Sequence, residues 1–407
     1  MLNRIKELKK DELVRGSIVL FVMVNLFNFF NYVYHFLMAR MLSVSDYGIL
    51  MSLFSLIYIF SVPSEAVQII FSKYTSECSK NKGKIKDLLF RGLRKAVKIS
   101  FLLYLAFIPI ALFLSFFLNI RLSLFLLTGL FIFGSFINPV ARGILQGKKR
   151  FFGLGASLNL ESVTKIIIAI ILVLAVGNVY GALYSVILST VVGFFVALFF
   201  IKDIIKSKRE KSGVKGIYGY SWSAFLLFTA IMMLLSLDVI LAKRFFSSDI
   251  VGKYAVASLL GKTIFFATSG IGKAMFPISS ERKVSEKKGV FVKALVLTVL
   301  LSLAAVIIFL TAPKLVIIIL FGGKYVEIGP ILVYTGIAFS MLSITNLIVL
   351  HKLSYKKAKY SYIMIFFVAM QAVLLYLFRE SVLNFSIALC VANFLAMLGS
   401  LALESER

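Results

Sequence analysis

The stretch SLNLESVTKIIIAIILVLAV, from Ser157 to Val176, is almost wholly apolar and is as long as a membrane is thick. About 20 apolar residues in a helix cross the roughly 30 Å of hydrocarbon in a bilayer. Two charged residues, Glu161 and Lys165, interrupt the run one turn apart and on the same helix face. The stretch therefore predicts a transmembrane helix, and it raises the question of what its two charges do.

The rest of the chain has the same character. Hydrophobic residues make up 60% of it and charged residues 15%, whereas soluble proteins have about 45–50% and 25%. About twelve apolar segments follow one another, without the alternating pattern of barrel strands, so we predict an all-α polytopic membrane protein. The approximate ranges of these segments are 17–39, 47–71, 97–118, 122–145, 151–176, 179–201, 218–242, 251–276, 290–311, 328–350, 358–378 and 381–401.

The basic residues orient the predicted helices. Of the 45 Lys and Arg, 34 fall in the two ends and in alternate connections, eight in the other connections, and three (Lys165, Lys262 and Lys273) within segments. Such an excess marks the cytoplasmic side, so we expect both termini there, in a multi-pass protein of the inner (cytoplasmic) cell membrane. The net charge of +27 is then explained by orientation and by contact with anionic membrane lipids, and no nucleic-acid partner is needed.

An internal repeat divides the chain. ARMLSVSD, from Ala39 to Asp46, matches AKRFFSSD, from Ala242 to Asp249, and each lies between the first and second segments of its half. The longest polar break falls between these halves, with six segments on each side. We therefore predict two parallel six-helix lobes, 1–206 and 217–407, joined by a cytoplasmic linker, 207–216.

Polar residues form a stripe on the first segment. Asn25, Asn28, Asn31 and His35 fall within an arc of about 120° at 100° per residue. One interpretation is a water-lined surface that binds cargo, with His35 able to take up a coupling proton. The alternative is interhelical hydrogen bonding without any ligand.

Acidic and basic residues inside other segments are further candidates, because a charge in hydrocarbon usually faces a polar interior. Pro63 should bend the second segment beside Glu65, either as a hinge with a proton site or as a static kink. We assign ion coupling to Glu65, Glu161, Asp238 and His35. We assign substrate binding to Lys165, Lys262, Asn25, Asn28 and Asn31. For Glu161 and Lys165 a purely structural ion pair is equally open.

The sequence gives little support for an enzyme or for a metal site. The chain has two cysteines and two histidines, so we expect neither a disulfide framework nor a metal site or cofactor. An integral-membrane glycosyltransferase or polysaccharide polymerase would need a sizeable extramembrane loop with catalytic residues. The short predicted outer connections argue against such an enzyme.

Three motifs carry a resemblance to a known family. They are ARMLSVSDYGILMSL from Ala39, RGILQGKKRFFGLGASLNLESVTK from Arg142, and DVILAKRFFSSDIVGKYAVASLLGKTIFF from Asp238. With them the chain resembles the polysaccharide flippases, which move lipid-linked oligosaccharides, of the multidrug/oligosaccharidyl-lipid/polysaccharide exporter superfamily. The resemblance extends over essentially the whole sequence.

That resemblance implies two six-helix lobes arranged as a V around a central cavity that opens alternately to each side. It also implies a polyprenyl-(pyro)phosphate-linked oligosaccharide as cargo, a coupling cation (H⁺ or Na⁺), and a polysaccharide polymerase or ligase as a possible partner. The first alternative is a cation-coupled multidrug exporter of the same superfamily. A lipid II flippase is less favoured, since the first segment is rich in Asn and not in cations. A lipid scramblase or a structural membrane protein is a further alternative.

Overall fold

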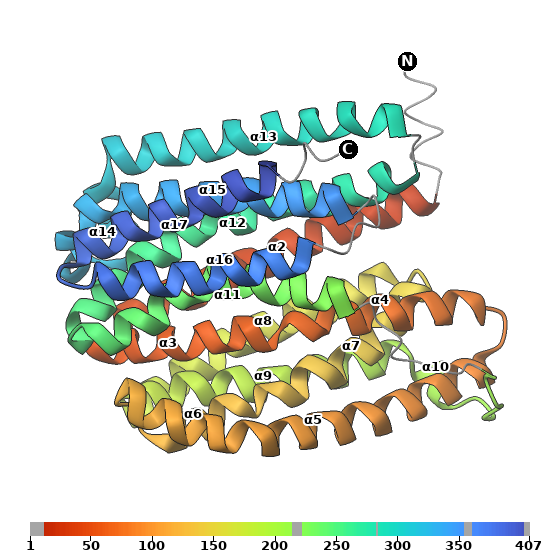
Figure 1. Cartoon of the computed structure of the whole chain (residues 1–407). Helices are drawn as coiled ribbons and strands as arrows, with labels where there is room; N and C mark the ends of the chain where they lie inside the picture. The colour runs from red at the N-terminus through yellow and green to blue at the C-terminus, as the bar shows by residue number, and fades with distance from the viewer. Residues whose placement is uncertain (1–11, 214–221, 282–283, 354–359, 403–407) are drawn as a thin grey trace. The chain divides into compact units, whose positions relative to one another are not determined.

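The computed structural model describes residues 12–213, 222–281, 284–353 and 360–402 (Figure 1). Over these ranges the chain forms α-helices and one 3₁₀ helix, and it forms no strand. The predicted all-α class is therefore confirmed. Residues 214–216 of the predicted linker lie outside the described residues.

The helices follow the predicted apolar segments closely. The first half of the chain contains α2 (Glu12–Met41), α3 (Val44–Phe60), α4 (Val62–Glu77), α5 (Lys82–Leu118), α6 (Leu122–Gly129), α7 (Phe131–Gly147), α8 (Phe151–Val176), α9 (Val179–Phe200) and α10 (Lys202–Ile205). The second half contains α11 (Trp222–Phe245), α12 (Ser248–Glu281), α13 (Val284–Thr311), α14 (Pro313–Phe321), η1 (Gly323–Ile328), α15 (Gly329–Leu353), α16 (Tyr360–Leu377) and α17 (Val382–Ala402).

Ten helical stretches within the described residues are long and apolar enough to cross a membrane. They coincide with ten of the twelve predicted segments. The first predicted segment coincides with α2, and the eleventh with α16, whose described apolar part, Ile363–Leu377, is shorter. The correspondence is close because the apolar length of a segment alone decides whether it can span the hydrocarbon.

The chain folds into two compact units, and one helix does not follow the sequence order. The first unit comprises Met1–Leu42 and Phe60–Tyr220, and the second unit comprises Ser43–Ile59 and Ser221–Arg407. Helix α3 thus belongs to the unit that contains the second half of the sequence. Nothing in the internal repeat indicates that α3 packs with the second half of the sequence. The predicted lobe limits of 1–206 and 217–407 stay a prediction.

The repeated motif marks the start of α3 and of α12. Ser43 precedes α3, and its Oγ accepts a hydrogen bond from the Asp46 N–H at 3.0 Å, which caps the helix. Asp46 and Asp249 each place a carboxylate in the first turn of their helix, where the helix dipole favours an anion. The repeat therefore has a local physical cause, the initiation of two equivalent helices.

Two glycines bring these helices together. A Cβ on Gly48 would lie 2.7 Å from the Gly252 backbone N and 2.9 Å from the Ser248 O, while a Cβ on Gly252 would overlap the Val44 O. Gly48 and Gly252 occupy equivalent places in α3 and α12, and Val44 and Ser248 open those helices. Each helix therefore contacts its counterpart with the same residues, and only glycine permits so close an approach.

A one-residue break, at Ser61, lies where the sequence predicts a bend beside Pro63. Helix α3 ends at Phe60, and α4 begins at Val62 with the proline in its first turn. Proline is tolerated there because its missing N–H would have no partner within the helix. The break also coincides with the boundary between the two units.

Candidate functional site

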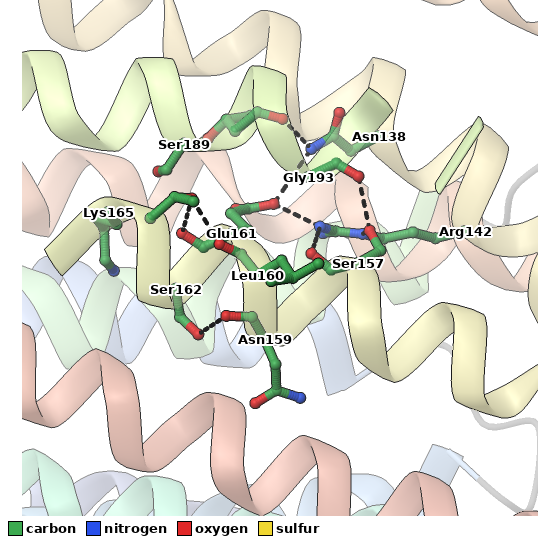
Figure 2. A network of polar contacts seen from close by, with 12 residues as sticks. Asn138, Arg142, Ser157, Asn159, Leu160, Glu161, Ser162, Lys165, Ser189 and Gly193 are labelled. Carbon is green, nitrogen blue, oxygen red and sulfur yellow. Dashed lines mark hydrogen bonds and ion pairs between the residues drawn. The ribbon is translucent and has the colours of Figure 1, made fainter. Parts of the chain in front are cut away.

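Helix α8 carries Glu161 and Lys165, whose side chains point in different directions (Figure 2). Glu161 pairs with Arg142 of α7, whose NH2 lies 2.5 Å from the Glu161 Oε2. The two side chains are 16% and 10% exposed, so the pair is largely withdrawn from solvent. A guanidinium satisfies a carboxylate in such a setting better than an ammonium, because its planar fork donates several hydrogen bonds.

Neighbouring polar groups hold this pair in place. The Arg142 Nε donates to the Ser157 Oγ at 3.0 Å, and that hydroxyl donates to the Gly193 carbonyl at 2.8 Å. The Asn138 Nδ2 donates to the Glu161 Oε2 at 3.4 Å and to the Thr190 carbonyl at 3.0 Å. Gly193 leaves the space that the pair occupies, since a Cβ there would overlap the Glu161 carboxylate and lie 2.9 Å from the Arg142 NH2.

Lys165 points away from this network, as Figure 2 shows, and toward α2. Its Nζ donates to the Asn31 Oδ1 and lies 4.6 Å from the centre of the Tyr34 ring. The structural ion pair considered for Glu161 and Lys165 is therefore not formed. Residues one turn apart share a face, but here Arg142 takes the carboxylate, which leaves the ammonium to an amide and an aromatic ring.

The remaining predicted residues of the first unit lie in different settings. Asn25 and Asn28 are exposed, whereas His35 is buried, with its ring edge-on to Tyr34 at 5.3 Å. The structure thus brings Asn31 together with Lys165 and does not bring Asn25 or Asn28 to it. Glu65, assigned to ion coupling, lies exposed in the first turn of α4.

The second unit contains a fully buried ion pair. Asp238 of α11 and Lys262 of α12 are both 0% exposed, with the Lys262 Nζ 3.0 Å from the Asp238 Oδ1. The other carboxylate oxygen accepts hydrogen bonds from the Ser258 hydroxyl at 2.5 Å and the Tyr254 hydroxyl at 3.2 Å. Lys262 also lies 5.4 Å from the centre of the Phe339 ring. Asp238 and Lys262, predicted separately, are thus one site, and each neutralises the other. The side chain of Lys273, in the same predicted segment as Lys262, lies outside the described residues.

Arg142 is the functional candidate that the sequence analysis missed. The count of basic residues assigns it to the cytoplasmic side because Lys148, Lys149 and Arg150 follow it closely. The sequence did carry a signal, since Arg142 falls inside the predicted segment 122–145. The structure shows this arginine to be buried. A charge inside an apolar segment needs a partner, and the next acid along the chain is Glu161.

Arg150, which directly precedes α8, forms a more exposed ion pair with Asp203 of α10. The Arg150 NH1 and NH2 donate to the two oxygens of Asp203 at 2.6 and 2.8 Å, and Lys82 lies 2.9 Å from the same carboxylate. These hydrogen bonds hold the pKa of Asp203 well below its usual range, mainly through Arg150, and raise the pKa of Arg150. The pair fastens the residues after α9 to the start of α8.

Comparison of the sequence with known families identifies the family of this chain. A profile of the family described as "Polysaccharide biosynthesis protein" matches residues 13–283, well over half of the chain. The chain belongs to this family. A search of curated protein sequences found no match.

Solved structures of similar fold are transporters. The chain superposes with a TM-score of 0.69 at 15% identity on an inward-facing multidrug resistance MATE family transporter of the MOP superfamily, covering 92% of this chain and 94% of that one. A MATE complexed with MaL6 gives 0.60 at 16% identity, covering 97% and 96%. A MOP superfamily transporter from Pyrococcus furiosus, whose binding pocket has reverse polarity, gives 0.52 at 16% identity, covering 96% and 94%. This member of the polysaccharide biosynthesis family therefore shares the fold of those transporters and is built from two compact units.

Proposed function

We propose that the protein moves a polyprenyl-(pyro)phosphate-linked oligosaccharide from the cytoplasmic to the outer leaflet of the inner cell membrane, for the synthesis of a surface polysaccharide or glycoprotein. The family supports a role in polysaccharide biosynthesis. The two lobes would alternate access by rocking against each other. Such a cargo has an anionic head and a long apolar tail, so its carrier needs cations inside the membrane.

The single observation that carries the proposal is the setting of Lys165. Its neighbour Glu161 is neutralised by Arg142, so these three charges sum to +1. Lys165 is held by an amide oxygen and a ring, and among the described residues no carboxylate lies within ion-pair distance of it. A cation that is desolvated and not neutralised favours a phosphate over a cationic drug.

The polarity of the site is what separates this proposal from a cation-coupled multidrug exporter. Carriers of cationic drugs need acidic residues to dominate their binding surface. The binding pocket of the Pyrococcus furiosus transporter has reverse polarity, which suggests a different function for that protein, so polarity varies among proteins of this fold. The positive balance around Lys165 favours an anionic cargo for this chain.

The experiment is a complementation in cells depleted of the protein. Lipid-linked oligosaccharide should accumulate in the inner leaflet, and its mass identifies the cargo. Lys165→Ala should fail to clear it, because losing a charged hydrogen bond weakens binding roughly tenfold to a hundredfold. Lys98→Ala, which removes an exposed lysine of α5, is the matched control and should restore the normal pool. A normal lipid-linked pool together with new sensitivity to cationic drugs would instead identify a multidrug exporter.

We assign the binding of the coupling cation, H⁺ or Na⁺, first of all to Asp238. Its carboxylate is held by Lys262, Tyr254 and Ser258, and protonation or cation binding there would release Lys262. The predicted role of Lys262 as a cargo-binding cation requires that release. Glu161, Glu65 and His35, and the Asn25 and Asn28 contacts to cargo, stay predictions, as does a partnership with a polymerase or ligase.

A further inference from the structure

A pocket in the second unit shares no residue with the Asp238–Lys262 pair. It has a volume of about 440 Å³ and is lined by Arg244, Phe245, Arg379 and Glu380. Helix α11 ends at Phe245, and the short connection 378–381 joins α16 to α17. Both lie at the same end of this unit, where the α11 terminus and the α16–α17 turn are adjacent in Figure 1. Under the predicted topology this is the outer end.

Aromatic rings fix one of the two arginines. The Arg379 guanidinium lies 4.1 Å from the centre of the Tyr376 ring and 5.4 Å from that of Phe245. These rings meet edge to face, with centroids 5.9 Å apart. A guanidinium that stacks on aromatic faces keeps its N–H edge free to donate, and little rotamer entropy is then lost when it binds. Within the part of the chain that the structure describes, no carboxylate forms an ion pair with Arg379.

The charge of the pocket matches one phosphate. Arg244 and Arg379 contribute two positive charges and Glu380 one negative charge, so the lining carries +1. A planar guanidinium donates two parallel hydrogen bonds to phosphate oxygens. The Glu380 carboxylate can accept hydrogen bonds from hydroxyl groups beside that phosphate, such as those of glycerol or of a sugar.

The surroundings favour a phosphate that belongs to a lipid. Tyr376, Leu377 and Phe378 adjoin the pocket and are 52%, 60% and 49% exposed. Exposed aromatic and aliphatic residues at the end of a spanning helix lie at the boundary between hydrocarbon and headgroups. A ligand here would have its head against the arginines and its chains along α16.

We infer that Arg379 and Arg244 form a binding site for the phosphate headgroup of a membrane lipid. The site does not depend on the identity of the transported cargo. Its phosphate could belong to a bilayer phospholipid or to a polyprenyl phosphate carrier, and free phosphate shares the same chemistry.

The test measures lipid retention by native mass spectrometry on the full-length protein in detergent. The probes are phosphatidic acid, undecaprenyl phosphate and inorganic phosphate. Arg379→Ala should weaken retention of at least one of the two lipids about tenfold, whereas Arg121→Ala, which removes an exposed arginine of the other unit, should leave retention unchanged. The two lipids distinguish the sources, since the stronger one identifies the occupant.

Three results would overturn the inference. Equal retention by wild type and Arg379→Ala would remove the site. An equal loss in Arg121→Ala would show that net charge alone retains the lipid. Binding of inorganic phosphate that neither lipid displaces would mean that the site is not for lipid.

Arg379→Lys keeps the charge without the planar fork, so its lipid retention should fall between that of the wild type and that of Arg379→Ala. Retention equal to that of the wild type would refute the role of the stacked guanidinium. Unfolding midpoints of all variants establish that they fold.

Discussion

The two units handle charge inside the membrane in different ways. In the first unit, Arg142 and Glu161 pair between α7 and α8, and Lys165 remains as an additional cation whose side chain contacts α2. In the second unit, Asp238 and Lys262 neutralise each other and are both fully buried. Under the proposed function, the first arrangement would offer a charge to a ligand, whereas the second would offer none until its pair separates. The two halves share the short motif that begins α3 and α12, but their buried charges are arranged differently.

The largest effect should come from breaking the buried pair of the second unit. Lys262→Ala leaves the Asp238 carboxylate without its cation in a dry environment, which costs about 3–5 kcal/mol. The measurement is the free energy of unfolding, or the shift in the unfolding midpoint, of the detergent-solubilised protein.

The matched control for that prediction removes both charges. Asp238→Leu combined with Lys262→Met should be close to neutral, because apolar groups of similar volume often replace a buried ion pair without loss. A double variant that is less stable than Lys262→Ala would contradict the view that the pair exists for coupling and not for stability.

The next largest effect should come from filling the space that Gly193 leaves for the Arg142–Glu161 ion pair. Gly193→Ala would place a Cβ against the Glu161 carboxylate and 2.9 Å from the Arg142 NH2. We expect a loss of about 1–3 kcal/mol from this overpacking, although alanine favours a helix more than glycine does. Gly270→Ala is the control, since a Cβ there meets nothing within 4 Å, and it should gain about 0.4–1 kcal/mol. Equal stability of the two variants would mean that the Arg142–Glu161 pair moves aside freely.

Replacing Lys165 should lower the stability less than replacing Lys262 does. Lys165→Met keeps the length of the side chain and loses the contacts to Asn31 and the Tyr34 ring, which are worth roughly 0.5–2 kcal/mol. Lys262→Met should cost clearly more, because it leaves Asp238 unpaired. Unfolding midpoints measured side by side decide the comparison. A Lys165→Met loss as large as that of Lys262→Met would show that Lys165 is a structural charge.

The features that depend on one helix at a time could be predicted from the sequence. Apolar length indicates the spans, and the repeated Ser and Asp residues mark where α3 and α12 begin. What failed depends on how helices pack against each other. Glu161 and Lys165 were correctly placed one turn apart, but their partners come from α7 and α2, and nothing local indicates which helix lies on which face of α8. The same reason explains why the count of basic residues assigns Arg142 to a loop.

The membership of α3 in the second unit is the clearest case of this limit. Its packing depends on Gly48 meeting Gly252, two residues far apart in sequence. Each glycine alone is compatible with any helix end. Only the backbone approach of the two helices shows why both positions lack a side chain.

The smallest predicted effect concerns a pair that is neither buried nor inside the membrane. Arg150 and Asp203 are about one-third exposed, so solvent screens them, and their contribution is at most about 1 kcal/mol. The pKa of Asp203 is lowered in the folded protein, so its contribution is fully present above the ordinary aspartate pKa of about 3.9 and is lost as pH falls through the lowered value. The unfolding midpoint of the wild type should therefore drop more than that of Asp203→Asn when pH is taken from 6 to below about 3. Because the variant lacks the titrating group, an identical acid dependence in both proteins would show that this pair does not fasten α10 to the start of α8.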